Sequence, residues 1–134
     1  MTELTANQIQ KYQKYSIPQL IKKAERKFNK FIRTRDLDKP CISCGRYSRL
    51  EAGHYYSGGH HPALRFNELN VNGQCKHCNC DAFLSGNLIE YRKGLVRKIG
   101  VNQVEQLDET VDRYKQIVYK WNRFFLIEVI EKYR

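Results

Sequence analysis

Two pairs of cysteines with the same internal spacing constrain this 134-residue chain more than any other feature. Cys41 and Cys44 form one CxxC pair, and Cys75 and Cys78 form another after an interval of 30 residues. Because two thiolates three positions apart can turn onto one ion, the pairs predict a closed, tetrahedral four-cysteine site for structural zinc. Two local disulfides or free thiols are the alternative, which suits an intracellular chain poorly.

The stretch CKHCNC, which contains the second pair, leaves two neighbouring side chains to interpret. Cys80 could substitute for Cys78 as a ligand, but CxC is the less common spacing, so we expect Cys80 to be a small buried residue. His77 lies between the two cysteines and is expected to point away from the ion. A site with four thiolates has no open position, so this zinc ion cannot be a catalytic metal.

Composition indicates the class of protein. The stretch MTELTANQIQ is polar and does not resemble a signal peptide. No segment approaches the ~20 apolar residues that a membrane-spanning helix needs. We therefore expect a cytoplasmic protein without membrane association. A hydrophobic content of 41% suits a single domain over residues 1–134.

The pattern of apolar residues divides the chain into three zones and predicts an α+β, mainly helical fold. Residues 1–35 are basic and helical, and Ser16 and Gln19 have the spacing of a capping box at a helix start. Residues 36–86 are rich in Gly, Asn, His and Cys. There RLEAGHYY is typical of a short strand, SGGHHP of a loop, and NVNGQC of a second short strand or a turn. Residues 87–134 are helical again.

The formal net charge is +10, and the excess of cations is concentrated early in the chain. Residues 1–40 hold 10 basic and 4 acidic side chains, a net +6, whereas residues 41–80 and 81–134 add +2 each. This bias favours a polyanionic partner, usually nucleic acid, although solubility alone is the alternative. Phosphate contacts are expected from one side of the first long helix, at Lys22, Lys23, Arg26, Lys27, Lys30 and Arg33.

Three polar side chains flank the predicted zinc site. His54 lies near the end of the first predicted strand, Asn70 precedes Cys75 by five residues, and Asn79 follows Cys78 directly. This arrangement resembles the HNH (ββα-metal) nucleases, in their His-Asn-Asn variant with a four-cysteine zinc clamp, and the phage endonuclease VII family. The stretches FIRTRD, CISCG, EAGHY, LRFNELN and SGNLIEYRKGL are similar to the phage NinG/Rap recombination family, over nearly the whole chain.

The resemblance implies a metal-dependent, structure-specific endodeoxyribonuclease, a phosphodiester hydrolase that acts on branched recombination intermediates such as Holliday junctions and D-loops. It implies a small zinc-bound ββα-metal core flanked by N- and C-terminal helices. It also implies a phage or prophage gene expressed in a bacterial host cell. A less selective HNH nicking nuclease is one alternative. A zinc-stapled recombination protein that binds branched DNA without cutting it is another.

The resemblance also implies roles for individual residues. His54 would be the general base that takes a proton from the attacking water, because an imidazole titrates near neutral pH. Asn70 would hold His54 or its loop in place. Asn79 would bind a catalytic Mg²⁺ or Mn²⁺ ion through its carbonyl oxygen. Arg65 would bind the scissile phosphate, unless it forms a surface ion pair instead.

One position departs from the HNH pattern. These enzymes usually carry an aspartate, a second ligand of the ion, directly before the base, and here that residue is Gly53. Glu51 is expected on the same face of the strand, about 7 Å away. It could reach the ion in place of the aspartate, or it could be a surface glutamate paired with an arginine. His60 and His61 are weaker candidates for metal or phosphate contacts.

The last zone raises the question of oligomeric state. One helix is expected to end at Gly100, and a longer one to begin near a cap at Asn102 and run to the C-terminus. The longer helix would carry a heptad stripe, which predicts a homodimer able to cut both strands of a junction; packing on the chain's own first helix is the alternative. The stripe consists of Val104, Leu107, Val111, Tyr114, Val118, Trp121 and Phe125.

Overall fold

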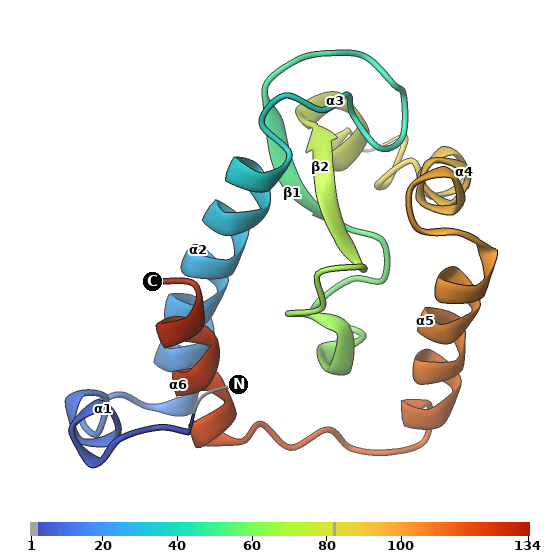
Figure 1. Cartoon of the computed structure of the whole chain (residues 1–134). Coiled ribbons are helices and arrows are strands. Elements are labelled where there is room, and N and C mark those ends of the chain that lie inside the picture. The colour runs from blue at the N-terminus through green and yellow to red at the C-terminus, as the bar shows by residue number, and fades with distance from the viewer. Residues whose placement is uncertain (1–2, 82) are drawn as a thin grey trace. The chain divides into compact units, whose positions relative to one another are not determined.

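The computed structural model describes residues 3–81 and 83–134 (Figure 1). Its helices are α1 (Ala6–Lys11), α2 (Ile17–Arg35), α3 (Lys76–Cys80), α4 (Leu88–Ile99), α5 (Val101–Tyr114) and α6 (Arg123–Lys132), with a short 3-10 helix, η1 (Pro62–Leu64). Two strands, β1 (Leu50–His54) and β2 (Val71–Cys75), form one antiparallel sheet. The predicted fold class, mixed and mainly helical, is confirmed at this level.

The chain divides into two compact units. Met1–Phe31 together with Lys120–Arg134 form the first, and Ile32–Tyr119 form the second. The three predicted zones and the single domain over residues 1–134 stay predictions. No helix in the described part of the chain is long and apolar enough to cross a membrane.

The first unit pairs the N-terminal helices with α6. As predicted, Ser16 and Gln19 form a capping box at the start of α2, each side chain bonding the other residue's backbone N–H. The ring of Tyr133 lies 5.1 Å from that of Phe28 and 4.8 Å from that of Phe31, centroid to centroid. Hence the end of α6 packs on α2 of the same chain, which was the alternative to a dimer interface.

The prediction of one long C-terminal helix is wrong. α5 ends at Tyr114, and α6 begins only at Arg123. Asn122 explains the second start, because its side chain accepts hydrogen bonds from the first backbone N–H groups of α6. The heptad stripe from Val104 to Phe125 therefore does not lie on one helix. Another correction concerns α5, which follows the left-handed Gly100 (φ 88°) rather than an Asn102 cap.

The second unit contains the sheet and its helical cover. β1 and β2 pair so that Glu51 lies opposite Gln74 and Gly53 opposite Asn72. The core of this unit consists of the buried side chains of Leu64, Tyr91, Leu95, Val104 and Leu107.

α4 is tied to both strands of the sheet. The hydroxyl of Tyr91 donates to the carbonyl of Gly53 (2.6 Å) and accepts from the amide of Asn72 (3.2 Å). Gly94 allows α4 to approach the first cysteine pair, since a β-carbon there would meet the carbonyl oxygen of Ile42 at 1.9 Å. The sheet is thus fixed against α4 beside the cysteines.

Candidate metal centre and adjoining polar groups

The four predicted zinc ligands lie together. The sulfur atoms of Cys41, Cys44, Cys75 and Cys78 are all within 4.8 Å of one another, and those of Cys44 and Cys75 are 3.8 Å apart. Four thiolates bound to zinc at ~2.3 Å would be roughly 3.8 Å apart in a regular tetrahedron. The set therefore fits a zinc ion. Among residues 3–81 and 83–134 it is the one group of three or more His, Cys, Asp or Glu side chains that could hold a metal.

Backbone donors surround these sulfur atoms, as expected for thiolates. The sulfur of Cys41 accepts from the N–H groups of Cys44 (3.5 Å) and Cys75 (3.3 Å), and that of Cys75 from Cys78 (3.4 Å). The amide of Asn87 donates to the sulfur of Cys78 at 3.5 Å. Burial of Cys41 opposes ionisation, but the donors outweigh it and lower the pKa of this thiol to about 7. Burial instead raises the pKa of the Cys75 thiol, and it raises that of Cys78 to about 12. Of these three thiols only Cys41 is shifted toward the thiolate, so an ion bound by the cluster would displace protons from the others.

The neighbours of the cluster follow the sequence prediction only in part. His77 is exposed, and its Nδ1 lies 3.6 Å from the carboxylate of Asp81, so it points outward as predicted. The prediction that Cys80 is buried is wrong, because this thiol is exposed and donates to Oε1 of Glu51 at 3.3 Å. As the last residue of the short α3, Cys80 faces β1 rather than the core.

Glu51 and Asn79 are in direct contact. Glu51 lies in the middle of β1, and Asn79 lies on α3 directly after Cys78. The amide of Asn79 donates to Oε1 of Glu51 at 3.0 Å. This hydrogen bond holds the pKa of Glu51 below its usual range, so the group is a carboxylate at neutral pH. A carboxylate and an amide carbonyl are oxygen donors of the type that Mg²⁺ and Mn²⁺ prefer.

His54 ends β1, and its ring contacts the following loop. Its Nε2 lies 2.9 Å from the carbonyl oxygen of Arg65, which can only accept, so Nε2 carries the proton. In the neutral ring the basic lone pair is then on Nδ1. The Arg65 side chain is partly buried and packs close to Gly58, where a β-carbon would come within 2.9 Å of its Cγ. The structure therefore places Arg65 beside His54.

Asn70 is fully buried and supports the same loop. Its amide nitrogen donates to the carbonyls of Tyr56 (2.9 Å) and Leu64 (3.1 Å), and its amide oxygen accepts from the N–H of Tyr56 at 2.9 Å. Asn70 thus joins the chain after β1 to η1. Of the two roles considered for it, holding the loop is the one this geometry provides.

The predicted side chains form two groups rather than one. Glu51 contacts Asn79. His54, three residues after Glu51 on β1, contacts Arg65 instead. Side chains alternate along a strand, so Glu51 and His54 point to opposite faces, about 10 Å apart along β1. His60 and His61 lie in the loop: His60 bonds Ser57 at 2.9 Å, and burial lowers the pKa of His61.

Gly53 cannot be replaced by the usual aspartate without rearrangement. A β-carbon at this position would lie 2.1 Å from Oε1 of Gln74 and 2.7 Å from its Cβ. The Gln74 side chain is fully buried, and its amide nitrogen donates to Ser43 (2.9 Å) and to the carbonyl of Gly86 (2.6 Å). Among the residues that the structure describes, its Oε1 has no hydrogen-bond partner. Gln74, which the sequence analysis missed, therefore fills the space beside Gly53.

A second polar cluster was also missed. The carboxylate of Asp36 is buried and contacts the guanidinium of Arg35 (2.7 Å), the N–H of Gly73 (2.8 Å) and the amine of Lys98 (3.5 Å). Lys98 also donates to the side chain of Asn72 at 2.6 Å. The adjacent Arg-Asp pair in FIRTRD is the sequence signal that could have indicated it. The cluster joins the end of α2 to β2 and α4.

Comparison with known proteins decides the family of this chain. The sequence profile described as "Bacteriophage Lambda NinG protein" matches residues 2–134. The chain belongs to the NinG family. The family resemblance predicted from the sequence is thereby confirmed, whereas the Rap, HNH and endonuclease VII assignments stay predictions. No solved structure matches this member of the NinG family.

Several curated relatives are named "Protein ninG". The chain is 43% identical to that of Escherichia phage lambda over 97 residues, covering 71% of the chain and 47% of the relative. It is 42% identical to that of Escherichia phage 933W over 100 residues (73% and 49%) and 42% identical to that of Salmonella phage P22 over 97 residues (71% and 47%). This NinG-family chain spans about half the length of the curated relatives it matches.

The cations predicted to bind DNA lie along α2 of this NinG-family chain. Five of the six are exposed: Lys22, Arg26, Lys27, Lys30 and Arg33. Lys23 is partly buried, with its amine 4.4 Å from the ring centroid of Tyr15. The buried positions of the same helix, such as Leu20, Ala24 and Phe28, follow the complementary spacing. A phosphate backbone could therefore reach most of the predicted set.

Proposed function

We propose that this chain is a metal-dependent endonuclease that cuts branched DNA, such as Holliday junctions and D-loops. The observation that carries the proposal is the Glu51–Asn79 contact of 3.0 Å beside the four-cysteine cluster, three residues before His54 on the same strand. Hard oxygen donors and an imidazole are thereby carried by elements that the cysteines fix. The two groups point to opposite faces of β1, which counts against a single compact catalytic centre.

The donor set fits a divalent ion only in part. Glu51 supplies one carboxylate and Asn79 one amide carbonyl, and Mg²⁺ is commonly held by one or two carboxylates together with water and substrate phosphates. When bound, Mg²⁺ or Mn²⁺ would stabilise the negative charge on the phosphate and on the leaving oxygen. Zinc in the four-cysteine cluster has a purely structural role in this proposal, since four thiolates leave no position open.

The chain's own residues provide the other parts of the reaction. His54 takes the proton of a water molecule whose oxygen forms a new bond to phosphorus, while the bond from phosphorus to the leaving oxygen breaks. The carbonyl of Arg65 orients the ring through Nε2, so that Nδ1 receives this proton. Arg65 can pair its guanidinium with the phosphate, and Asn70 holds the loop that carries Arg65.

Symmetric cutting of a junction requires two active sites, and a homodimer remains part of the proposal for that reason. The heptad stripe from Val104 to Phe125 no longer supports a homodimer, since it is divided between the separate helices α5 and α6 and the segment between them. Sedimentation of the protein with and without junction DNA decides the point. A monomer in both states at micromolar concentration contradicts the dimer.

Gly53 favours a second candidate function. The space that the second metal-ligating side chain occupies in HNH enzymes is filled here by Gln74. A zinc-stapled protein that binds branched DNA without cutting it would have no need for that ligand. A less selective nicking nuclease would need the same ligands as the leading proposal, so the geometry does not favour it separately.

One assay tests these alternatives. Zinc-loaded protein is incubated with Mg²⁺ or Mn²⁺ and either a synthetic four-way junction or a linear duplex of matched sequence. We expect cutting of the junction, and we expect His54→Ala to abolish cutting while junction binding is retained, because a general base acts on the chemical step. Binding without cutting by the wild type supports the second candidate, and equal cutting of both DNAs supports the nicking nuclease.

A further inference from the structure

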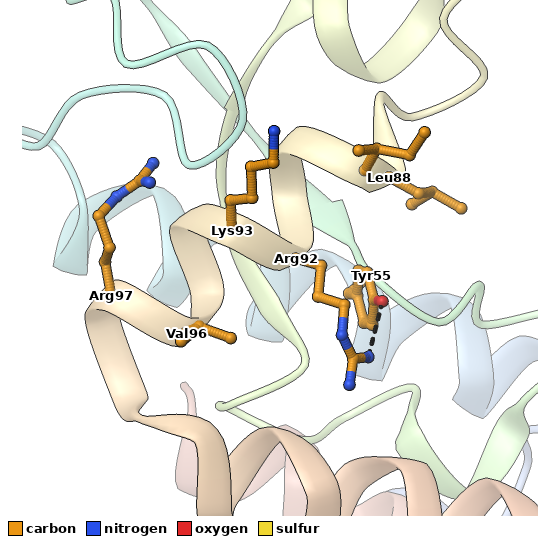
Figure 2. Close-up of a pocket in the computed structure, with 7 residues that line it drawn as sticks. Tyr55, Leu88, Arg92, Lys93, Val96 and Arg97 are labelled. Atoms are coloured by element: carbon orange, nitrogen blue, oxygen red, sulfur yellow. Dashed lines mark hydrogen bonds between the residues drawn. The ribbon is translucent and has the colours of Figure 1, made fainter.

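A shallow hollow of about 690 Å³ lies along the outward side of α4 (Figure 2). Its apolar lining comes from Leu88, Ile89 and Val96 and from the ring of Tyr55. The inward side of α4 is the buried one, with Tyr91 in the core. The volume is within the roughly 300–1,000 Å³ typical of ligand sites. The hollow therefore has the size and the lining of a binding site.

Cations border this apolar surface. Arg92, Lys93 and Arg97 complete the lining, which contains no carboxylate among the described residues. Two of these cations pair with carboxylates beside the hollow, Arg92 with Asp108 at 2.8 Å and Lys93 with Glu90 at 3.1 Å. In Figure 2, Lys93 and Arg97 extend to one side of the helix, and Arg92 and Tyr55 face each other on the other side. The ligand that fits should combine an apolar face with negative charge beside it.

Two flat groups in the hollow are held in fixed positions. Nη2 and Nη1 of Arg92 donate to the carboxylate of Asp108 (2.8 and 3.2 Å), and Nη1 also donates to the hydroxyl of Tyr55 at 3.1 Å. The Tyr55 ring lies 4.9 Å from that of Tyr56 and 5.3 Å from that of Tyr91. Because Asp108 compensates its charge, Arg92 offers mainly the face of its guanidinium, which stacks well on other flat groups.

The aliphatic part of the hollow is open to solvent. Ile89 is 76% exposed and Leu88 is 44% exposed at the start of α4. Exposed apolar side chains that adjoin cations are typical of surfaces that bind a partner. Nucleobases have apolar faces and carry phosphate on both sides, but in a continuous duplex those faces are stacked on each other. Only a base that has left the stack can present its face to this hollow.

We propose that the hollow on α4 binds an unpaired nucleobase at a DNA branch, with the flanking phosphates beside Lys93 and Arg97. This rests on the proposed function in one respect, that the substrate is branched DNA. Tyr55 directly follows His54, so the bound base would lie next to the strand end that carries the candidate general base. Recognition of the unpaired base would direct this chain to branches without reading sequence.

The test measures binding, with Ca²⁺ in place of Mg²⁺ or Mn²⁺ so that cutting does not interfere. The probe is a three-way junction that carries an unpaired 2-aminopurine at its branch, and a linear duplex containing the same strand is the comparison. Ile89→Gln removes the exposed apolar contact without disturbing the core. Val118→Gln is the matched control, because Val118 is 85% exposed in the same unit and lies outside the hollow.

We expect Ile89→Gln to weaken junction binding at least about fivefold and to reduce the fluorescence change of the 2-aminopurine, as loss of an apolar contact with the base does. Duplex affinity should stay unchanged, and Val118→Gln should bind both DNAs like the wild type. Unchanged junction binding and fluorescence in Ile89→Gln overturn the inference, even if the wild type cuts junctions. An Ile89-dependent signal in a protein that cuts no DNA supports the inference and contradicts the nuclease proposal.

Discussion

The amide nitrogen of Asn79 lies 3.0 Å from Oε1 of Glu51, and this contact joins the residue after the last cysteine of the cluster to the middle of β1. If both residues bind the catalytic ion, Glu51→Gln should raise the Mg²⁺ or Mn²⁺ concentration needed for half-maximal cutting by roughly tenfold, with a smaller effect on the rate at saturation. Asn79→Ala should be partly rescued by excess Mn²⁺. An unchanged metal requirement in both variants would exclude them as ligands.

Gly53 and Gln74 should be energetically coupled. Gly53→Ala places a β-carbon 2.1 Å from Oε1 of Gln74, and overpacking of this kind costs about 1–3 kcal/mol of unfolding free energy. The matched control is Gly59→Ala, because a β-carbon there meets nothing within 4 Å. Urea denaturation of the single variants, of Gln74→Gly and of Gly53→Ala/Gln74→Gly measures the coupling, because glycine also removes the Gln74 Cβ that would lie 2.7 Å away. Simple additivity would show that the two side chains do not compete for the same space.

The zinc prediction has an internal control, because the chain has a fifth cysteine. Cys75→Ser should abolish binding of about one zinc per chain and lower the thermal stability, since metal-binding energy here is folding energy. Cys80→Ser should keep both, because Cys80 is exposed and outside the cluster. Metal analysis by mass spectrometry together with thermal unfolding checks this. A folded wild-type protein without zinc would refute the assignment.

The cysteine set and the strands were predictable because each depends on local spacing. Cys41, Cys44, Cys75 and Cys78 form the cluster that their spacing indicates, and β1 and β2 lie within the two stretches expected to be strands. A capping box needs only residues three apart, which is why Ser16 and Gln19 were found. The family was equally visible, because short stretches along the whole chain resemble it.

Features that depend on tertiary packing were not predictable. The contact of Gln74 with Gly53 arises from strand register, and no local pattern records it. Heptad spacing from Val104 to Phe125 suggested a continuous helix, but it cannot detect that Asn122 starts a new one. The exposure of Cys80 follows from the shortness of α3. At the candidate site, the sequence indicated which side chains could take part but not that they form two groups.

Asp36 should make stability depend on pH. Burial would raise the pKa of this carboxyl, but hydrogen bonds from Arg35 and the N–H of Gly73, with the charge of Lys98, hold it below its usual value of 3.8. Because the pKa is lower in the folded state, ionised Asp36 stabilises the folded protein above about pH 4. This stabilisation is lost as the pH falls through the folded-state pKa. Asp36→Asn should thus lower the unfolding free energy by about 1.5–3 kcal/mol at neutral pH, the range for hydrogen bonds to a charged group, and the difference should shrink in acid. Asp38→Asn, an exposed neighbour, is the control.

The cations of α2 should contribute salt-dependent, sequence-independent DNA affinity. Lys22, Arg26 and Arg33 are exposed and share one side of the helix by their spacing, opposite the buried stripe. Each phosphate contact releases counterions, so replacing all three with Gln should reduce the slope of log affinity against log salt by about 2–3. Replacing Arg113, Lys115 and Lys120, also exposed, removes the same net charge and serves as the control. Fluorescence anisotropy with labelled duplex at several salt concentrations measures both slopes. If the two triple variants change the slope equally, the effect is one of net charge. The cations of α2 would then face solvent without binding phosphate.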